Sequence, residues 1–203
     1  MMRQSIACLI TILICTACAS QKQAAGDSDV MVLDFANTKG AYVIAYTADQ
    51  DVRKAFEDQL VADLATRDIT AWPSYPNIPD ATKTTRDVVL TAANAKKAMF
   101  VILAEQVPPG KKAVSQGQGR ITHEHPDLQD FYEHSKPPGD QFDPDKQVFV
   151  EVTAYLIQGN RAKSFWSGTT WAFNADGEGS AIKSISTTIA DAILKARQQF
   201  LQN

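Results

Sequence analysis

The chain has 203 residues and a formal net charge of −3, with acidic and basic residues interspersed. This balance argues against the positive surface that binding to a nucleic acid requires, so no nucleic-acid partner is expected. The length suits one domain that buries its core without metal or disulfides. All three cysteines lie within the first 18 residues, which leaves the rest of the chain without a thiol.

An export signal occupies the amino terminus. Arg3 is followed by an apolar run over 6–14 and by small residues before Cys18. The run is shorter than the ~20 residues that a membrane-spanning helix needs. The pattern resembles the signal of bacterial lipoproteins, in which the cysteine thiol receives a diacylglycerol and the mature amino terminus an acyl chain such as palmitate. The resemblance implies a signal peptide over 1–17 and a lipidated Cys18 that attaches the protein to a membrane.

The residues around Cys18 also bear on processing and sorting. Cys15 stands where lipoprotein signals usually have Leu, so a cut after Ala19 that releases a soluble periplasmic protein is the alternative. Ser20 is not the Asp that resembles a retention signal for the inner membrane. We therefore expect the protein in the outer membrane, facing the periplasm. A polar, flexible tether completes 18–29, and the domain spans 30–203, beginning with a short strand over 30–35.

Two strand-and-helix units follow. A strand is predicted over 41–46, with Asp49 as the N-cap of the next helix. The inward face of that helix carries Val52, Phe56, Leu60 and Leu64. Its polar residues are expected on the solvated sides: Arg53, Lys54, Glu57, Asp58 and Asp63.

The second unit starts with a strand over 69–72 and a proline-rich loop over 73–79. A helix begins at Thr84 or Thr85 and turns Val88, Val89, Ala92 and Ala93 inward. The apolar run over 99–104 predicts a central strand.

A hairpin and a last helix complete the domain. Side chains alternate with a period of two residues over 148–157 and 165–173, and a turn is expected at 159–160. This pattern predicts two antiparallel strands. The helix over 180–201 carries one apolar stripe, made of Ile182, Ile185, Ile189, Ile193, Ala196 and Phe200. The fold class is therefore α/β, a single-domain sandwich whose helices pack on a mixed sheet in the order β-α-β-α-β-β-β-α.

Several short segments carry a resemblance: VRKAFEDQLV over 52–61, WPSY over 72–75, IP over 78–79 and KSFWSG over 163–168. They look like a group of small uncharacterised Gram-negative outer-membrane lipoproteins. The element order is similar to that of the penicillin-binding-protein activator LpoB, the amino-terminal domain of TolB and the curli secretion lipoprotein CsgG. The resemblance implies a docking module of the envelope and no reaction.

A long connection over 106–146 contains all three histidines. His123, His125 and His134, with neighbouring carboxylates, suit zinc, copper or nickel. The interpretation that we favour is a solvated polar loop whose histidines bind nothing, and a metal site is the alternative. Phe131 and Tyr132 are expected to be exposed there and to contact a partner.

The hairpin adds a further candidate, because Trp166 and Trp171 point to opposite faces of the sheet and one of them is expected to face a partner. No G-x-S-x-G turn or phosphate loop is present in the sequence. The predicted function is a lipid-anchored binding or adaptor domain with an envelope protein as partner, no cofactor and no enzymatic activity. The alternative is a periplasmic metal-binding lipoprotein that uses the histidine loop, and a hydrolase comes third.

Overall fold

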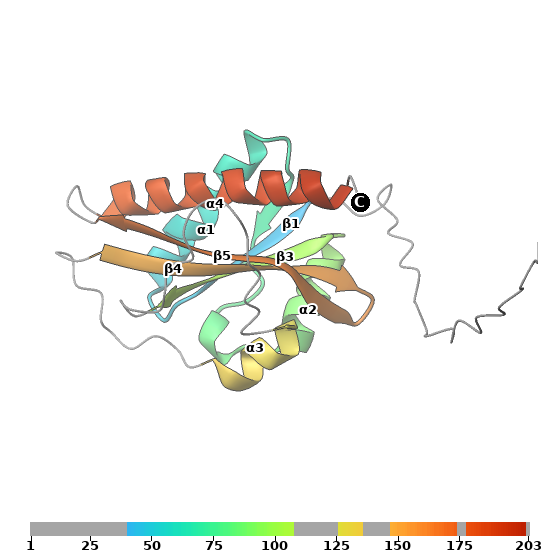
Figure 1. Ribbon diagram of the computed structural model, residues 1–203. Helices are drawn as coiled ribbons and strands as arrows, with labels where there is room; N and C mark the ends of the chain where they lie inside the picture. Colours follow the sequence, from blue (N-terminus) through green and yellow to red (C-terminus); the bar gives the residue numbers. More distant parts are fainter. Residues whose placement is uncertain (1–39, 108–125, 136–146, 174–177, 202–203) are drawn as a thin grey trace, which may run out of the picture. The chain divides into compact units, whose positions relative to one another are not determined.

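A five-stranded mixed sheet organises the chain in the computed structural model, which describes residues 40–107, 126–135, 147–173 and 178–201 (Figure 1). The elements in chain order are β1 (Ala41–Tyr46), α1 (Gln50–Ala65), β2 (Ala71–Pro73), the 3₁₀ helix η1 (Ala81–Lys83), α2 (Arg86–Ala95), β3 (Phe100–Val107), α3 (Leu128–His134), β4 (Gln147–Gln158), β5 (Arg161–Phe173) and α4 (Glu178–Leu201). The α/β class and the order of the expected elements are confirmed.

The strand order in the sheet is β2-β1-β3-β4-β5. β1 pairs in parallel with β2 and β3, whereas β3 with β4 and β4 with β5 are antiparallel. β3 is the central strand, as its apolar run predicts. The prediction of one irregular connection over 106–146 is wrong in two places, because β3 continues to Val107 and α3 forms inside the connection.

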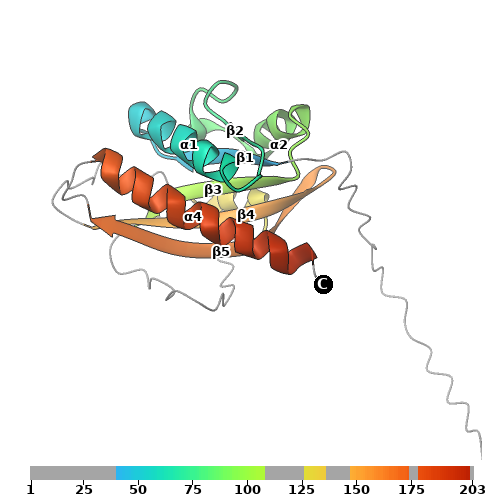
Figure 2. The same ribbon diagram turned by 90° about the horizontal axis from the view of Figure 1, so that it is seen from above.

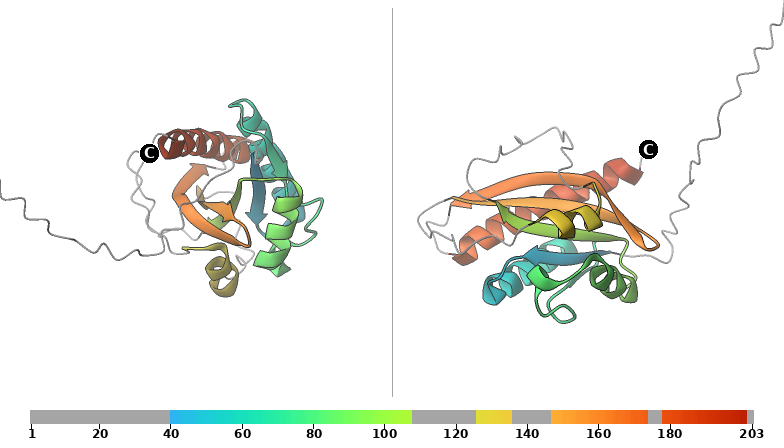
Figure 3. Two further views of the ribbon diagram at one scale, coloured as in Figure 1. Left: turned by 90° about the vertical axis from the view of Figure 1, so that its right-hand side faces the viewer. Right: turned by 90° about the horizontal axis from the view of Figure 1, so that it is seen from below.

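Helices cover both faces of the sheet. Figure 3 shows α1 and α4 on one side and α2 and α3 on the other. Alternate residues of β1 belong to the two cores. Val43 lies in the α1/α4 core together with Leu60 and Ile189. Tyr42 lies in the α2/α3 core together with Val89 and Phe131. All six residues of β1 are buried, as expected for a strand covered on both faces.

The sequence predicts where the first two helices begin, but only part of the face that each helix buries. The Asp49 side chain accepts hydrogen bonds from the Asp51 and Val52 amides, at 2.9 and 3.1 Å, which confirms it as the N-cap of α1. α2 follows Thr85, as predicted, but Val88 is 48 % exposed. The expectation of an inward Val88 is therefore wrong, and Leu90 is buried instead.

α4 docks through its predicted stripe. Ile185, Ile189 and Ile193 are buried, and α4 packs along α1. A polar contact fixes the pair, since the Ser186 hydroxyl donates to Asp63 Oδ2 at 2.7 Å. None of the helices in the described residues is both long and apolar enough to cross a membrane.

The β4-β5 hairpin turns at Gly159 and Asn160, as predicted, and Gly159 takes a positive φ of 62°. The pairing then shifts: Ala154 faces Trp166 while Tyr155 faces Ser164, so Phe165 is an extra residue in β5. Phe165 stacks edge-on against Phe100 with ring centroids 5.9 Å apart, and both Phe165 and Trp166 pack on the α1/α4 core. The prediction that side chains alternate strictly between the two faces of the sheet along β5 is therefore wrong at Phe165.

Candidate functional site

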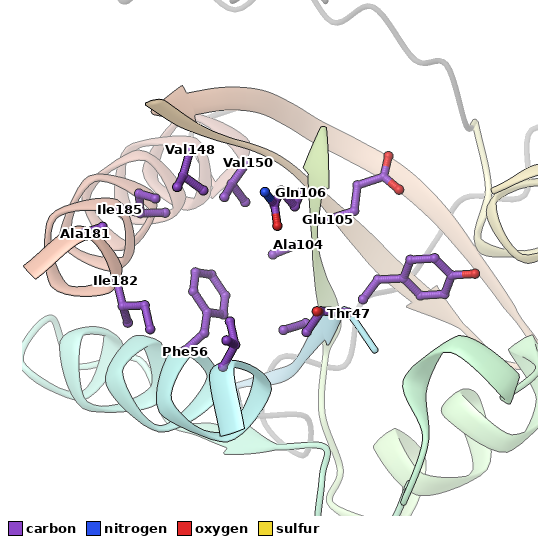
Figure 4. Close-up of a pocket in the computed structure, with 13 residues that line it drawn as sticks. Thr47, Phe56, Ala104, Glu105, Gln106, Val148, Val150, Ala181, Ile182 and Ile185 are labelled. Atoms are coloured by element: carbon purple, nitrogen blue, oxygen red, sulfur yellow. The ribbon is translucent and has the colours of Figure 1, made fainter. Parts of the chain in front are cut away.

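A pocket opens at the carboxyl ends of β1 and β3, between the start of α1 and the start of α4 (Figure 4). Its volume is about 60 Å³. Its lining comes from five elements and one loop: Ala45, Tyr46, Thr47, Val52, Phe56, Ala104, Glu105, Gln106, Val148, Val150, Ala181, Ile182 and Ile185.

The chain path explains why a hollow forms here. From β1 the chain passes through α1 to β2 on one side, and from β2 it returns through α2 to β3 on the other side of β1. Right-handed crossovers in opposite directions place α1 and α2 on opposite faces. The gap outside the carboxyl ends of β1 and β3 is therefore the topological switch point, where open α/β sheets bind ligands.

The lining is apolar with a few polar groups. Phe56, Val150 and Ile185 point into the pocket, whereas the Glu105 carboxylate points away from it (Figure 4). Thr47 and Gln106 supply the polar groups that border the space. Such a lining favours an apolar group of a few carbon atoms that carries a hydrogen-bonding neighbour.

The sequence analysis gave no prediction for this pocket. Three alanines, Ala45, Ala104 and Ala181, line it where larger residues are the rule along the same buried strands and helix. Small residues that meet across a core leave space, but only the fold shows that these three meet. Their recurrence on inward-facing positions is the one signal in the sequence.

A buried ion pair on α1 is hydrogen-bonded to one residue of the pocket lining. Arg53 and Glu57 are both fully buried, and Arg53 Nε lies 2.9 Å from Glu57 Oε1. Glu57 Oε1 also accepts from the Ala45 amide at 3.0 Å, and Ala45 lines the pocket. The expectation that these two side chains face solvent on α1 is wrong.

The same pair holds the proline-rich loop. Glu57 accepts from the Ser74 hydroxyl at 2.8 Å and from the Ser74 and Tyr75 amides at 2.6 and 3.0 Å. Arg53 donates to Ser74 Oγ at 2.7 Å and to the Pro79 carbonyl at 3.2 Å. Every charge is thus matched by a hydrogen bond, which is the condition for a buried pair to persist. Through Glu57 the network ties Ala45 of β1, which lines the pocket, to α1.

The aromatic residues proposed for partner binding lie differently from the expectation. Phe131 is 1 % exposed and packs edge-on against Tyr46, with ring centroids 5.0 Å apart. The predicted exposure of Phe131 is therefore wrong. Tyr132 is half-buried, and burial raises the pKa of its hydroxyl, which has no hydrogen-bond partner among the described residues. Trp166 is half-buried against the core, and Trp171 is the tryptophan that faces outward, at 46 % exposed.

The histidines are only partly described. His134 ends α3 and is exposed, with Nδ1 3.1 Å from Asp130 Oδ1. His123 and His125 lie outside the described residues, as do Cys18, the tether and the strand expected over 30–35. Within the described ranges, no three His, Cys, Asp or Glu side chains gather as a metal site. Binding of zinc, copper or nickel by the three histidines stays a prediction.

Among known proteins, matches to this chain are found with solved structures alone. No protein-family model matches the chain, and no curated protein matches its sequence. The PelC dodecamer from Paraburkholderia phytofirmans is 16 % identical, with a TM-score of 0.38 over 75 % of this chain and 86 % of that chain. Lipoprotein GNA1162 from Neisseria meningitidis is 12 % identical, with a TM-score of 0.35 over 75 % of this chain and 99 % of that chain. With TM-scores below 0.5, these likenesses carry no conclusion about function, and the similarity to LpoB, TolB and CsgG stays a prediction.

Proposed function

We propose that this protein is a lipid-anchored binding or adaptor protein of the bacterial cell envelope. Cys18 holds it in the outer membrane, the domain faces the periplasm, and it acts without a cofactor and without catalysing a reaction. The observation that supports this proposal is the apolar pocket at the switch point of the sheet.

The size of the pocket limits what it binds. A volume of about 60 Å³ accommodates an aliphatic side chain presented by another envelope protein rather than a whole cofactor. Burial of one such side chain contributes about 1.5–3 kcal/mol, too little for a stable complex alone. The pocket therefore serves as an anchor point within a larger and reversible contact, which is the behaviour of an adaptor.

Blocking the pocket is expected to remove the partner. Ile182 lines the pocket and is half-buried, so Ile182→Lys places a charge in the apolar space. We expect at least a tenfold loss of the envelope protein that copurifies after crosslinking in native membranes. Ala181→Leu, which fills the pocket with an apolar side chain, is expected to have the same effect without introducing a charge.

Val88→Lys is the matched control, because Val88 is an exposed aliphatic residue on α2, on the opposite face of the sheet. The amount of envelope protein that copurifies with Val88→Lys is expected to equal the amount that copurifies with the parent protein. Melting temperatures of all three variants show whether a loss reflects unfolding. An unchanged set of partners in both folded pocket variants would contradict the proposed function.

A further inference from the structure

The helix α3 is short and stands apart from the α1/α4 core. It has 7 residues, whereas α1, α2 and α4 have 16, 10 and 24. A helix of this length is unstable in water by itself, so α3 depends on its contacts with the sheet. In the view from above, α4 lies in front of the sheet and α3, in yellow, lies behind it (Figure 2). The two helices belong to different cores, so a loss of α3 leaves the α1/α4 core in place.

Two kinds of contact hold α3 on the sheet. Just before the helix begins, the Ser164 amide and hydroxyl of β5 both donate to the Pro126 carbonyl at 3.0 Å. Along the helix itself, the side chains of Leu128 and Phe131 are buried in the α2/α3 core. α4, by comparison, buries a whole stripe of hydrophobic side chains. Because stabilisation by burial grows with the apolar area removed from water, α3 is held less firmly than α4.

Buried hydroxyl groups without a hydrogen-bond partner gather at this helix. Among the described residues, such oxygens belong to the side chains of Thr84, Tyr132, Ser135 and Tyr155. Tyr132 lies on α3, and Ser135 is the residue that caps its carboxyl end. Tyr155 of β4 lies in the α2/α3 core. Three of these four oxygens are therefore found in the α3 segment or in the core that it covers.

These hydroxyl groups weaken the attachment of α3. A buried hydroxyl without a partner destabilises the state that buries it, because it gives up hydrogen bonds to water and gains none. Burial also raises the pKa of the Tyr132 and Tyr155 hydroxyls, as removal from water requires. When α3 leaves the sheet, the hydroxyls of Tyr132 and Ser135 return to water with the segment that carries them. They therefore favour the detached state over the docked one.

We propose that α3 is a cover that detaches from the sheet as a unit while the rest of the domain stays folded. Segments with few buried apolar contacts are the ones that open locally in folded proteins. Detachment uncovers the ring of Tyr46, which packs edge-on against Phe131 and Tyr132 with ring centroids 5.0 and 6.3 Å away. Tyr46 also lines the pocket, so the cover adjoins the site of the proposed function. Detachment of α3 does not itself require that function.

Amide hydrogen exchange of the full chain, read residue by residue, tests the detachment. The Phe131 amide donates to the Asp127 carbonyl at 3.2 Å and the Ser135 amide to the Phe131 carbonyl at 2.8 Å, so both exchange when α3 opens. We expect them to exchange on the order of 100-fold faster than the Ile189 amide in the middle of α4. Low urea concentrations that speed exchange at Ile189 are expected to leave the α3 rates unchanged, because a local opening exposes little surface.

Tyr132→Phe tests the cause of the detachment. Without the buried hydroxyl the docked state is more favourable, so we expect the α3 amides to exchange about tenfold more slowly and the α4 amides to be unaffected. Tyr42→Phe is the matched control, because the Tyr42 hydroxyl belongs to the same core but donates to the Ser74 carbonyl at 3.5 Å. This control is not expected to slow exchange in α3.

Two results would overturn the cover. One is a parent protein in which the α3 amides are protected as strongly as those of α4, which would show that α3 opens only when the whole domain unfolds. The other is a Tyr132→Phe variant whose α3 amides exchange as fast as in the parent or faster, which would show that the hydroxyl is satisfied in the docked state. Both results are independent of any partner at the pocket, so they leave the proposed function to its own test.

Discussion

Glu57→Ala is expected to destabilise the domain by about 3–5 kcal/mol, because it leaves the Arg53 guanidinium buried without its countercharge. The change also removes the acceptor for the amides of Ala45, Ser74 and Tyr75. Buried donors left without acceptors add to the cost. The free energy of unfolding from urea denaturation measures the effect.

Asp58→Ala is the control for this change. Asp58 is the next residue on α1 and accepts a hydrogen bond from the Tyr75 hydroxyl at 3.0 Å, but it is exposed. An exposed contact of this kind contributes about 0–1 kcal/mol. If Glu57→Ala and Asp58→Ala lowered stability equally, the buried network would not hold the proline-rich loop as described.

Ile189→Asp is expected to unfold the domain. Ile189 is 2 % exposed and lies in the core beneath α4, among residues of the sheet and α1. A carboxylate there would lie in a cluster of buried apolar residues from the sheet, α1 and α4. The cost of several kcal/mol is a large fraction of the ~5–15 kcal/mol that stabilises a typical domain. Far-ultraviolet circular dichroism and thermal melting detect the loss of cooperative unfolding.

Ser184→Asp tests the same helix without burial, because Ser184 is exposed. It is expected to melt within about 0.5 kcal/mol of the parent protein. A cooperative transition at the parent temperature in Ile189→Asp would show that α4 does not dock through this face.

Periodicity was sufficient to predict most of the fold. The alternation in β4 and β5 and the four-residue spacing in α1 and α4 are local signals, and the structure forms those elements at nearly the predicted positions. α3 was missed because its seven residues are too few for a helical period to stand out within a polar segment. Phe165, the extra residue of the bulge, packs against Phe100, a residue far away in the sequence that no local pattern links to it.

The candidate site was harder to predict for the same reason. The sequence predicts that Arg53 and Glu57 face solvent, because charged side chains on an amphipathic helix usually do. Their burial depends on Ser74 and Pro79, which reach α1 only after the chain has formed β2. The sequence predicts an exposed Phe131 because the residue lies in a polar connection. In the structure, α3 turns its side chain into the core beside Tyr46. The pocket forms where three alanines from three different elements meet. No local sequence pattern predicts such a meeting.

Mass spectrometry of the amino-terminal peptide from native membranes tests the lipid anchor most directly. The apolar run over 6–14 and the small residues before Cys18 predict a mature chain that begins at Cys18, with diacylglycerol on its thiol and an acylated amino group. Cys18→Ser is then expected to move the protein out of the detergent phase. A mature chain that begins with an unmodified Ser20 would contradict the lipid anchor and with it the assignment to the outer membrane.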